Sequence, residues 1–506
     1  MDVRQYLGPY PFLVLGGGLL VAYLLISRFA TWYRLRHFRG PVLARFSYLF
    51  MLRILRSRDH GRRYQKLYED YDREELLRIG PNDLLTSSAA MVRHMNSVRS
   101  PYLRSSWYRA QRFDPYRDNL FSIKDTGEHD KLKTQLGFGY TGKDVPTIES
   151  DVDEQLRKLV ALIKRKYISN DNEYRPMDMG SMAIFFAVDS ISSISFGKAF
   201  GNLEDGVDIH EFEEFAQAAS IKGSTFSEIP WLGSIFFYPP VLQLLGPKDT
   251  DEKGLGMFMR FANELLSKRL GPNGKSQKDM LGSFISRGVS LEQCKAEIIF
   301  QILAGSDTTA HAVRATVLSV ISSPKVYTKV QAEIDAAIAD GRIRSSPVLA
   351  EEVKLLPYMQ AVIKEGLRFS PPTTALVSKQ VPPEGDNFEG RYIPGGTRVS
   401  VNILAIQRSK EIFGQDPDVF RPERWIDISE EKYRDMSQTV DQVFGWGRWQ
   451  CLGKQIALLE LNKVIVELLR HFDFQVVDLQ QPWKSYDHTL WIISDFWVRV
   501  TERSVQ

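Results

Sequence analysis

The residue of this sequence best suited to chemistry is Cys451, which lies in a loop rich in glycine and aromatic residues. From Phe444 the loop reads Phe-Gly-Trp-Gly-Arg-Trp-Gln-Cys-Leu-Gly, so that Gly447 and Gly453 flank the thiol. Glycine lets a backbone approach a bulky planar group and adopt turns that other residues avoid. A helix is predicted to follow, from Leu452 to Phe472, and the unpaired amides at its start should stabilise a thiolate.

A single thiolate in such a loop indicates one kind of metal centre better than others. Structural zinc prefers four protein ligands, which this loop does not offer. A lone thiolate suits the axial position of haem iron, where it donates electron density and favours O–O cleavage. The alternative is a buried free cysteine, a common environment for this residue. We adopt that alternative for Cys294, which lies between Gln293 and Lys295 with no such loop.

An acid and a hydroxyl stand side by side in a long predicted helix, Leu291–Ile321. Asp307 and Thr308 together could relay protons to a bound molecule. Gly305, two residues earlier, costs a helix about 1 kcal/mol relative to alanine. We expect that cost where the helix passes close to the face of a bound group. An ordinary Asp-Thr pair on a helix face is the alternative.

Glu365 and Arg368 are three residues apart, so they share one face of a predicted helix and can pair. Pro422-Glu423-Arg424-Trp425 lies downstream and supplies Arg424. Taken alone, such a pair is usually a solvated surface ion pair that contributes little.

The motifs occur in the order Asp-Thr, Glu-x-x-Arg, Pro-Glu-Arg and Cys, and together they resemble those of the cytochrome P450 family of haem-thiolate monooxygenases. The resemblance runs from about Gly40 to Val500 and is strongest to fungal microsomal members. It implies a mainly α-helical fold with small β-sheets and a single large haem domain. It implies haem b as the cofactor. The residues that it assigns are Cys451 as the iron ligand; Phe444, Gly447 and Gly453 in the haem loop; Asp307 and Thr308 in oxygen activation; and Glu365, Arg368 and Arg424 in structural support of the loop.

The sequence departs from the family where haem propionates bind. The family usually places an arginine two residues before the cysteine, but this chain has Trp449 there and Arg448 one residue earlier. His129 and Lys133 stand where the family has a Trp-x-x-x-Arg pair. Arg448, Lys133 and His129 are therefore our candidates for the propionates, although His129 fits a surface residue as well. The resemblance also gives four candidate substrate-lining residues: Ala304, Thr374, Ala375 and Leu376.

The chain begins with a candidate membrane anchor. Leu7–Ile26 carries no charge, and a bilayer core needs about 20 apolar residues. Ten arginines and one acid follow between residues 28 and 63, so the bulk of the chain is expected to be cytosolic and the anchor to span once. A cleaved signal peptide lacks support because Ser27-Arg28-Phe29 offers no small-residue cleavage site; a core helix is the other alternative. The arginines could bind anionic headgroups or form a solvated linker.

The rest of the sequence predicts one domain. We expect an anchor at residues 1–27, a basic linker at 28–60 and a catalytic domain at 61–506, with a further helix at Asp151–Tyr167 and strands within Leu76–Thr86 and Arg391–Ile403. The 65 basic and 62 acidic residues leave a net charge of +3, too small for a dedicated nucleic-acid binder. Two cysteines exclude a disulfide framework.

We therefore predict an enzyme of the endoplasmic reticulum membrane that inserts one atom of O₂ into an apolar small molecule. Fungal specialised-metabolite biosynthesis is the expected setting. Electrons would come from NADPH through a separate flavin reductase, docked near a basic patch of Arg448, Lys454, Lys131 and Lys133. A haem-thiolate isomerase or dehydratase that needs no O₂ is one alternative. A non-enzymatic binder of haem or lipophiles at the membrane surface is the other.

Overall fold

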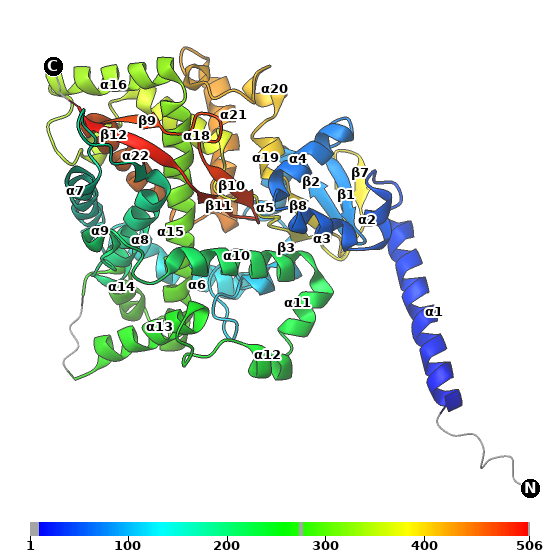
Figure 1. Cartoon of the computed structure of the whole chain (residues 1–506). Coiled ribbons are helices and arrows are strands. Elements are labelled where there is room, and N and C mark those ends of the chain that lie inside the picture. Colours follow the sequence, from blue (N-terminus) through cyan, green and yellow to red (C-terminus); the bar gives the residue numbers. More distant parts are fainter. Residues whose placement is uncertain (1–9, 273–276, 504–506) are drawn as a thin grey trace, which may run out of the picture.

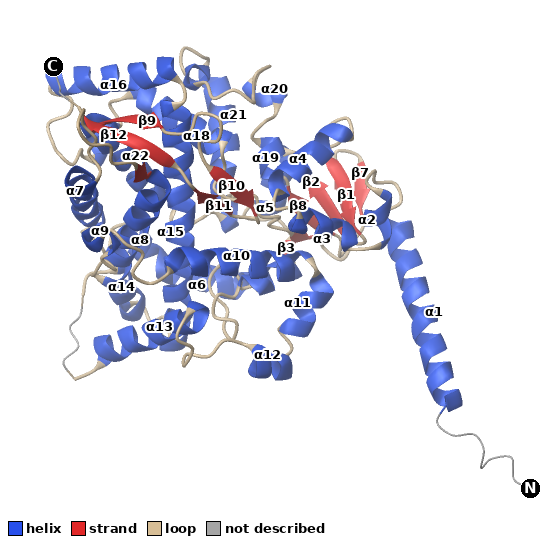
Figure 2. Cartoon of the chain, viewed as in Figure 1, coloured by secondary structure: helices blue, strands red, loops and turns tan. Residues whose placement is uncertain are grey.

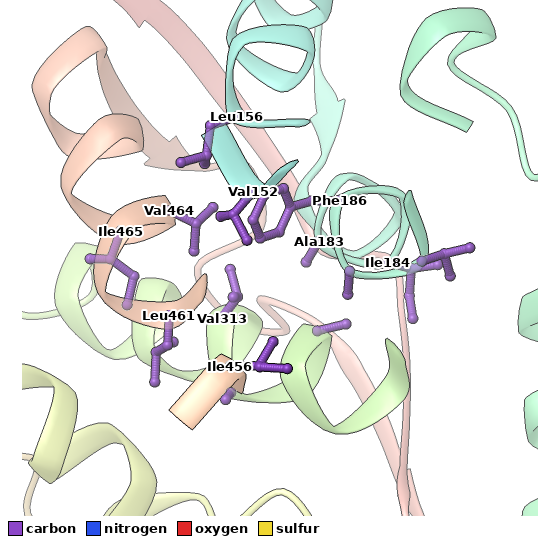
Figure 3. Close-up of a cluster of buried hydrophobic side chains, with 14 of the residues drawn as sticks. Val152, Leu156, Ala183, Ile184, Phe186, Val313, Ile456, Leu461, Val464 and Ile465 are labelled. Atoms are coloured by element: carbon purple, nitrogen blue, oxygen red, sulfur yellow. The ribbon is translucent and has the colours of Figure 1, made fainter. Parts of the chain in front are cut away.

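Four helices pack together at the centre of the molecule and form its core. The computed structural model describes residues 10–272 and 277–503. The core helices are α7 (Ile148–Lys166), α8 (Met179–Phe196), α15 (Leu291–Ile321) and α22 (Lys454–His471). Figure 3 shows side chains of this core, among them Val152, Phe186, Val313 and Leu461. The predicted fold class, mainly α-helical with small sheets, is confirmed.

The sequence explains why these helices lie where they do. In α7, Val152, Leu156, Leu159 and Ile163 recur at helical spacing and are buried, so one face of the helix packs inward. The longer α15 starts at Ser290, whose hydroxyl accepts a hydrogen bond from the Gln293 amide. Both predicted helices are confirmed, and the third begins at Lys454, two residues later than expected.

The remaining helices surround this core and extend toward the N-terminus (Figure 1). The longer ones are α1 (Tyr10–Arg34), α4 (His60–Asp70), α6 (Thr126–Tyr140), α10 (Phe212–Glu228), α13 (Gly254–Leu270), α16 (Pro324–Ala339), α18 (Pro357–Phe369) and α21 (Glu430–Asp441). The shorter ones are α2 (Val42–Phe46), α3 (Leu49–Arg56), α5 (Ala89–Asn96), α9 (Asn202–Asp205), α11 (Pro230–Phe236), α12 (Pro239–Leu245), α14 (Met280–Ser286), α17 (Ala350–Val353), α19 (Ile403–Ile406) and α20 (Lys410–Phe413). Four 3₁₀ segments complete the described helices: η2 (Ser106–Gln111), η3 (Pro422–Trp425), η4 (Gln442–Phe444) and η5 (Gly447–Trp449).

The strands form small sheets beside the helical core, and the largest lies near α1 (Figure 2). Its strand order is β1-β2-β8-β5-β3, with β1 (Leu76–Gly80), β2 (Asp83–Thr86), β8 (Arg398–Val401), β5 (Lys379–Gln380) and β3 (Leu103–Arg104). The other described sheets are β4 (Met177–Asp178) with β12 (Trp497–Glu502) and β9 (Phe472–Val476), the pair β10 (Lys484–Asp487) and β11 (Trp491–Ser494), and the pair β6 (Asp386–Phe388) and β7 (Arg391–Ile393). Both regions predicted to hold strands do so.

The segment at residues 28–60, predicted to be a basic linker, is folded onto the domain. The first helix continues to Arg34, and α2 and α3 occupy most of the following segment. Leu35 and Phe38 are buried against the large sheet, and Met51 and Ile54 are buried in a neighbouring cluster. Apolar residues between the arginines account for the difference, because their burial folds this segment onto the domain.

Two described helices are long and apolar enough to cross a membrane, and their burial separates them. Met179–Phe196 is 94% buried, so it is a core helix. Val14–Arg34 has a mean hydropathy of 1.7 and its described apolar window is 0% buried, and α1 projects away from the body of the molecule (Figure 1). This is consistent with the expected anchor, whose first residues lie outside the part of the chain that the structure describes.

Candidate active site

Cys451 is held by a tight loop at the start of α22. Its amide donates a hydrogen bond to the Phe444 carbonyl at 2.7 Å, which closes the loop. Gly447 has φ +55° and faces the Asn96 carbonyl so closely that any side chain at this position would collide with it. Gly445 also has a left-handed backbone, at φ +74°. These two positions therefore require glycine.

The thiol lies deep in the protein but is not covered. Cys451 is accessible to solvent, yet burial raises the pKa of its thiol. The amides of Gly453 and Lys454 and the ammonium of Lys133 act in the opposite direction. The start of the helix therefore favours a thiolate, as expected, but desolvation of the thiol outweighs this effect.

The middle of α15 borders accessible space as well. Ala304, Gly305, Asp307 and Thr308 are partly accessible, although the helix around them is mostly buried. Their spacing places them on one face of the helix. Burial raises the pKa of Asp307 to about 6. The Thr308 hydroxyl donates to the Ala304 carbonyl at 2.7 Å, within the same helix.

Gly305 owes its identity to a neighbouring helix. A Cβ at this position would come 2.7 Å from Cγ1 of Ile191 in α8. The two helices share the most extensive contact in the fold. The prediction that Gly305 reflects the approach of the helix to a bound group is therefore corrected: close packing of α15 on α8 requires the glycine.

The Glu365–Arg368 pair is wholly buried, so the alternative of a solvated surface pair is wrong. Arg368 donates to both carboxylate oxygens, at 2.9 and 2.8 Å. Arg424 and the Trp425 indole each donate to the same carboxylate at 2.9 Å. These donors lower the pKa of Glu365 in spite of its burial, which by itself raises that pKa.

This network reaches the cysteine loop through hydrogen bonds. Arg368 donates to the Gln407 carbonyl at 2.8 Å, and the Gln407 amide donates to the Thr439 carbonyl at 2.7 Å. Thr439 lies in α21, which leads through η4 directly into the loop at Phe444. The predicted supporting residues are therefore connected to the segment that presents Cys451.

Two buried cations lie beside the loop that sequence reasoning did not find. Arg104 in β3 and Lys379 in β5 are directly opposite each other in their strand pair. They are 3% and 1% exposed. The Arg104 guanidinium lies 4.2 Å from the centre of the Trp449 ring, and the Lys379 ammonium lies 3.7 Å from it. Trp449 thus has a cation against it from each of two strands.

The hydrogen bonds of these two cations are incomplete, although Arg104 Nη1 donates to the carbonyls of Leu120 and Ile123 at 2.8 and 2.7 Å. Lys379 Nζ and Arg104 Nε have no hydrogen-bond partner in the described part of the chain. Burial and the neighbouring guanidinium of Arg104 hold the pKa of Lys379 well below its ordinary value. Like charges placed opposite each other across strands destabilise a sheet. A bound anion between Arg104 and Lys379 would offset both the repulsion between the two charges and the cost of burying them.

The three residues predicted to meet propionates have different roles. His129 is buried, with its ring 4.3 Å from that of Trp449, so the alternative of a surface residue is wrong. Lys133 donates to the carbonyls of Arg448 and Gln450, at 2.6 and 3.0 Å, and so braces the cysteine loop. Arg448 pairs with Asp130 and donates to the Val98 carbonyl. The prediction that Arg448 binds a propionate is therefore not supported, because its guanidinium is already engaged.

A family model described as Cytochrome P450 matches residues 105–496. The chain belongs to the cytochrome P450 family. It is similar to the cytochrome P450 monooxygenase ABA1 of Pyricularia oryzae, at 44% identity over 496 residues, 97% of each chain. It is also similar to the monooxygenase aba1 of Botryotinia fuckeliana, at 39% identity over 465 residues, which are 91% of this chain and 90% of the relative. The monooxygenase mpaDE of Penicillium roqueforti is 29% identical over 482 residues, 91% of this chain but 54% of the relative.

These comparisons confirm the family inferred from the motifs, and with it the class of a haem-thiolate monooxygenase. The site of this P450 fits haem. Its accessible thiol would offer a ligand to the iron, and Arg104 and Lys379, each with a nitrogen that lacks a hydrogen-bond partner in the described part of the chain, would suit the two carboxylates of haem. No cluster of three or more His, Cys, Asp or Glu side chains that could hold a metal is found among the described residues.

The predicted substrate-lining residues of this P450 do not all reach open space. Ala304 and Ala375 are partly accessible. Thr374 is buried, and its hydroxyl donates to Asp487 at 2.6 Å. Leu376 is 1% exposed and packs in the cluster that contains Met51. We remove Thr374 and Leu376 from the candidate set, because successive residues of this extended segment point to opposite sides.

Proposed function

We propose that this P450 uses haem bound by Cys451 to insert one atom of O₂ into an apolar small molecule. One observation carries the proposal: the Cys451 thiol just before α22 and the acid-hydroxyl face of α15 are both accessible, and these two helices pack together in the core. Bound haem supplies the binding of dioxygen and the transfer of the oxygen atom. The protein supplies the ligand, the proton donors and an apolar chamber.

Side chains from the cysteine loop, α6, β3 and β5 are proposed to hold the haem. Cys451 would provide a thiolate ligand to the iron, and Lys133 would stabilise the negative charge on its sulfur. Arg104 and Lys379 would bind the carboxylates, and both lie against the loop residue Trp449, whose ring His129 also contacts. Phe444, Gly447 and Gly453 shape the loop for this approach.

Asp307 and Thr308 are proposed to deliver protons. A carboxyl with a pKa of about 6 is partly protonated near neutral pH, so Asp307 can both release and recover a proton there. The adjacent Thr308 hydroxyl can pass a proton on once it releases the Ala304 carbonyl. Both groups lie on the accessible face of α15.

Aromatic side chains support an apolar substrate. Phe300 lies one turn before Ala304 on α15 and stacks on both Phe113 and Phe121, with ring centres 6.0 Å apart in each pair. All three rings are partly accessible. Such a wall favours apolar molecules and excludes water. The fungal monooxygenases to which the chain is similar support a role in fungal specialised metabolism.

We place the protein in the endoplasmic reticulum membrane, spanning once through α1 with its catalytic domain in the cytosol. The exposed apolar surface of α1 and the arginines that follow it support this orientation. Electrons are proposed to come from NADPH through a separate flavin reductase near the cysteine loop. Of the four predicted patch residues, Lys131 is exposed, whereas Lys133, Arg448 and Lys454 have partners within the protein.

The test is an absorption spectrum of the purified full-length protein, reduced and exposed to carbon monoxide. We expect the far-red Soret band of thiolate-bound haem in the wild type and in C294A, and its loss in C451S. The same band in C451S would overturn the assignment of the ligand. Product formation should then require both reductant and O₂. Turnover without them would favour the isomerase alternative, and ligand binding without turnover of any apolar compound would favour the binding protein.

A further inference from the structure

A buried arginine joins the end of α1 to the catalytic domain. Arg78 in β1 is fully buried. Its guanidinium donates to five backbone carbonyls, at distances between 2.6 and 3.3 Å, and these belong to Thr31, Trp32, Arg45, Gly80 and Pro81. One side chain thus links the anchor helix, α2 and the turn between β1 and β2.

The arrangement is built on electrostatics. Burial lowers the pKa of Arg78 to about 10, and none of its described hydrogen bonds goes to a carboxylate. The Thr31 and Trp32 carbonyls lie in the last turn of α1, where a helix carries partial negative charge and lacks internal donors. Arg78 therefore caps α1 from outside the helix, and the helix end compensates the buried charge.

Further contacts stiffen the same junction. The Arg78 amide donates to the Arg39 carbonyl at 2.7 Å. Gly40 lies over the Arg78 carbonyl, where a larger residue would collide. His37 Nε2 lies 3.1 Å from the Tyr392 carbonyl in β7. The chain between the anchor and the domain is therefore tied to two sheets, which a flexible tether would not be.

An apolar surface lies on the side toward which α1 projects. Figure 1 shows α11 and α12 extending from the body of the domain on that side. Trp231, Ile235, Tyr238, Leu244 and Leu245, on and between these helices, are 54–77% exposed. So many exposed apolar side chains on two short helices indicate an interaction surface. Since α1 is the proposed membrane anchor, the lipid bilayer is the partner that this surface meets.

We propose that Arg78 locks α1 to the catalytic domain and so holds the α11–α12 surface against the bilayer. The anchor then sets the orientation of the domain as well as its location. This inference rests on the proposed membrane anchoring.

The experiment uses the full-length, haem-loaded protein in nanodiscs with and without lipids brominated in their acyl chains, which quench nearby tryptophans. The contribution of Trp231 is the difference between each protein and its W231F counterpart. We expect strong quenching of Trp231 in the wild type and a fall of at least twofold in R78Q. R53Q is the matched control, because Arg53 is an exposed arginine of α3, and it should behave as the wild type. Equal quenching in R78Q and the wild type would overturn the lock.

A second measurement needs no variant. Trypsin should cut slowly after Arg34, Arg36 and Arg39 in the wild type if the junction is rigid, and rapid cutting there would contradict the proposal. Extraction of the wild-type chain from membranes by alkaline carbonate would instead contradict the anchor itself. The two failures are therefore distinguishable.

Discussion

Among single residues, burial and hydrogen bonding together decide which acids carry charge. Glu365 and Glu460 are both fully buried. Burial raises the pKa of Glu365, but the guanidinium groups of Arg368 and Arg424 and the Arg421 amide outweigh it and lower that pKa. The pKa of Glu460 is raised to about 8 by burial, since the Thr309 hydroxyl, at 3.3 Å, is its only hydrogen-bond partner among the described residues. The first acid is a charged structural centre and the second is neutral at pH 7.

Glu460 should therefore make the folded protein less stable as pH rises. Its folded pKa lies above its unfolded value, so unfolding releases a proton between about pH 4.5 and 8 and becomes more favourable across that window. We expect E460Q to raise the free energy of unfolding at pH 8 by about 1–3 kcal/mol, with little effect near pH 5. Denaturant titrations at the two pH values measure this.

Glu467 on the same helix provides the control with the opposite sign. Its pKa is lowered by His471 and the Val348 amide in spite of burial, so its ionised form stabilises the folded state above the unfolded pKa. E467Q should therefore destabilise the protein at pH 8. A gain in E460Q that was the same at both pH values would contradict the assignment of a raised pKa.

At the scale of elements, short strands and close helix packing place the site. The two-residue strands β3 and β5 bring Arg104 and Lys379 together across 275 positions of sequence. The packing of α15 on α8 fixes the face that carries Asp307 and Thr308. The positions of the candidate site residues therefore depend on strand pairing and helix packing outside the site itself.

The contact between Gly305 and Ile191 can be tested by a double-mutant cycle. We expect G305A to lower the free energy of unfolding by about 1–3 kcal/mol, because the new methyl group overpacks the interface. I191A makes room for that methyl group, so G305A should cost much less in the I191A background. Denaturant titration of the four proteins gives the coupling energy. Additive effects would show that Ile191 is not the reason for the glycine.

At the scale of the whole molecule, charge and membrane attachment govern the proposed encounter with a reductase. Lys131 in α6 is exposed, and no hydrogen bond or ion pair of its side chain is found in residues 10–272 and 277–503. Its neighbours Lys133 and Arg448 use their charges to hold the cysteine loop. The docking patch is therefore smaller than the sequence indicates.

K131E should slow electron transfer from the reductase by up to about tenfold at low salt. The effect should shrink at high salt, because the screening length falls from about 30 Å at 0.01 M to about 3 Å at 1 M. K325E is the control, since Lys325 is exposed on α16, far along the chain. Stopped-flow reduction under carbon monoxide measures the rate. An equal loss in both variants would contradict a patch near the loop.

The sequence by itself determined the family, the long helices and the loop that holds the candidate haem ligand, Cys451. The loop from Phe444 to Gly453 is a continuous segment, so its conformation depends mainly on neighbouring residues in the chain. The long helices have apolar residues that recur at helical spacing. Glu365 and Arg368 share a helix face for the same local reason, although their burial could not be read from the spacing.

Only the tertiary structure decided the surroundings of that ligand. Arg104 and Lys379 belong to two-residue strands that no periodicity reveals, and they meet through long-range pairing. The reason for Gly305 lies on another helix, at Ile191. The arginine-rich segment after α1 folds onto the domain because Leu35 and Phe38 are buried against the large sheet. Arg78 also donates hydrogen bonds to backbone carbonyls at the end of α1. The burial of a side chain depends on which distant residues pack against it in the folded chain, and these contacts cannot be read from a single sequence.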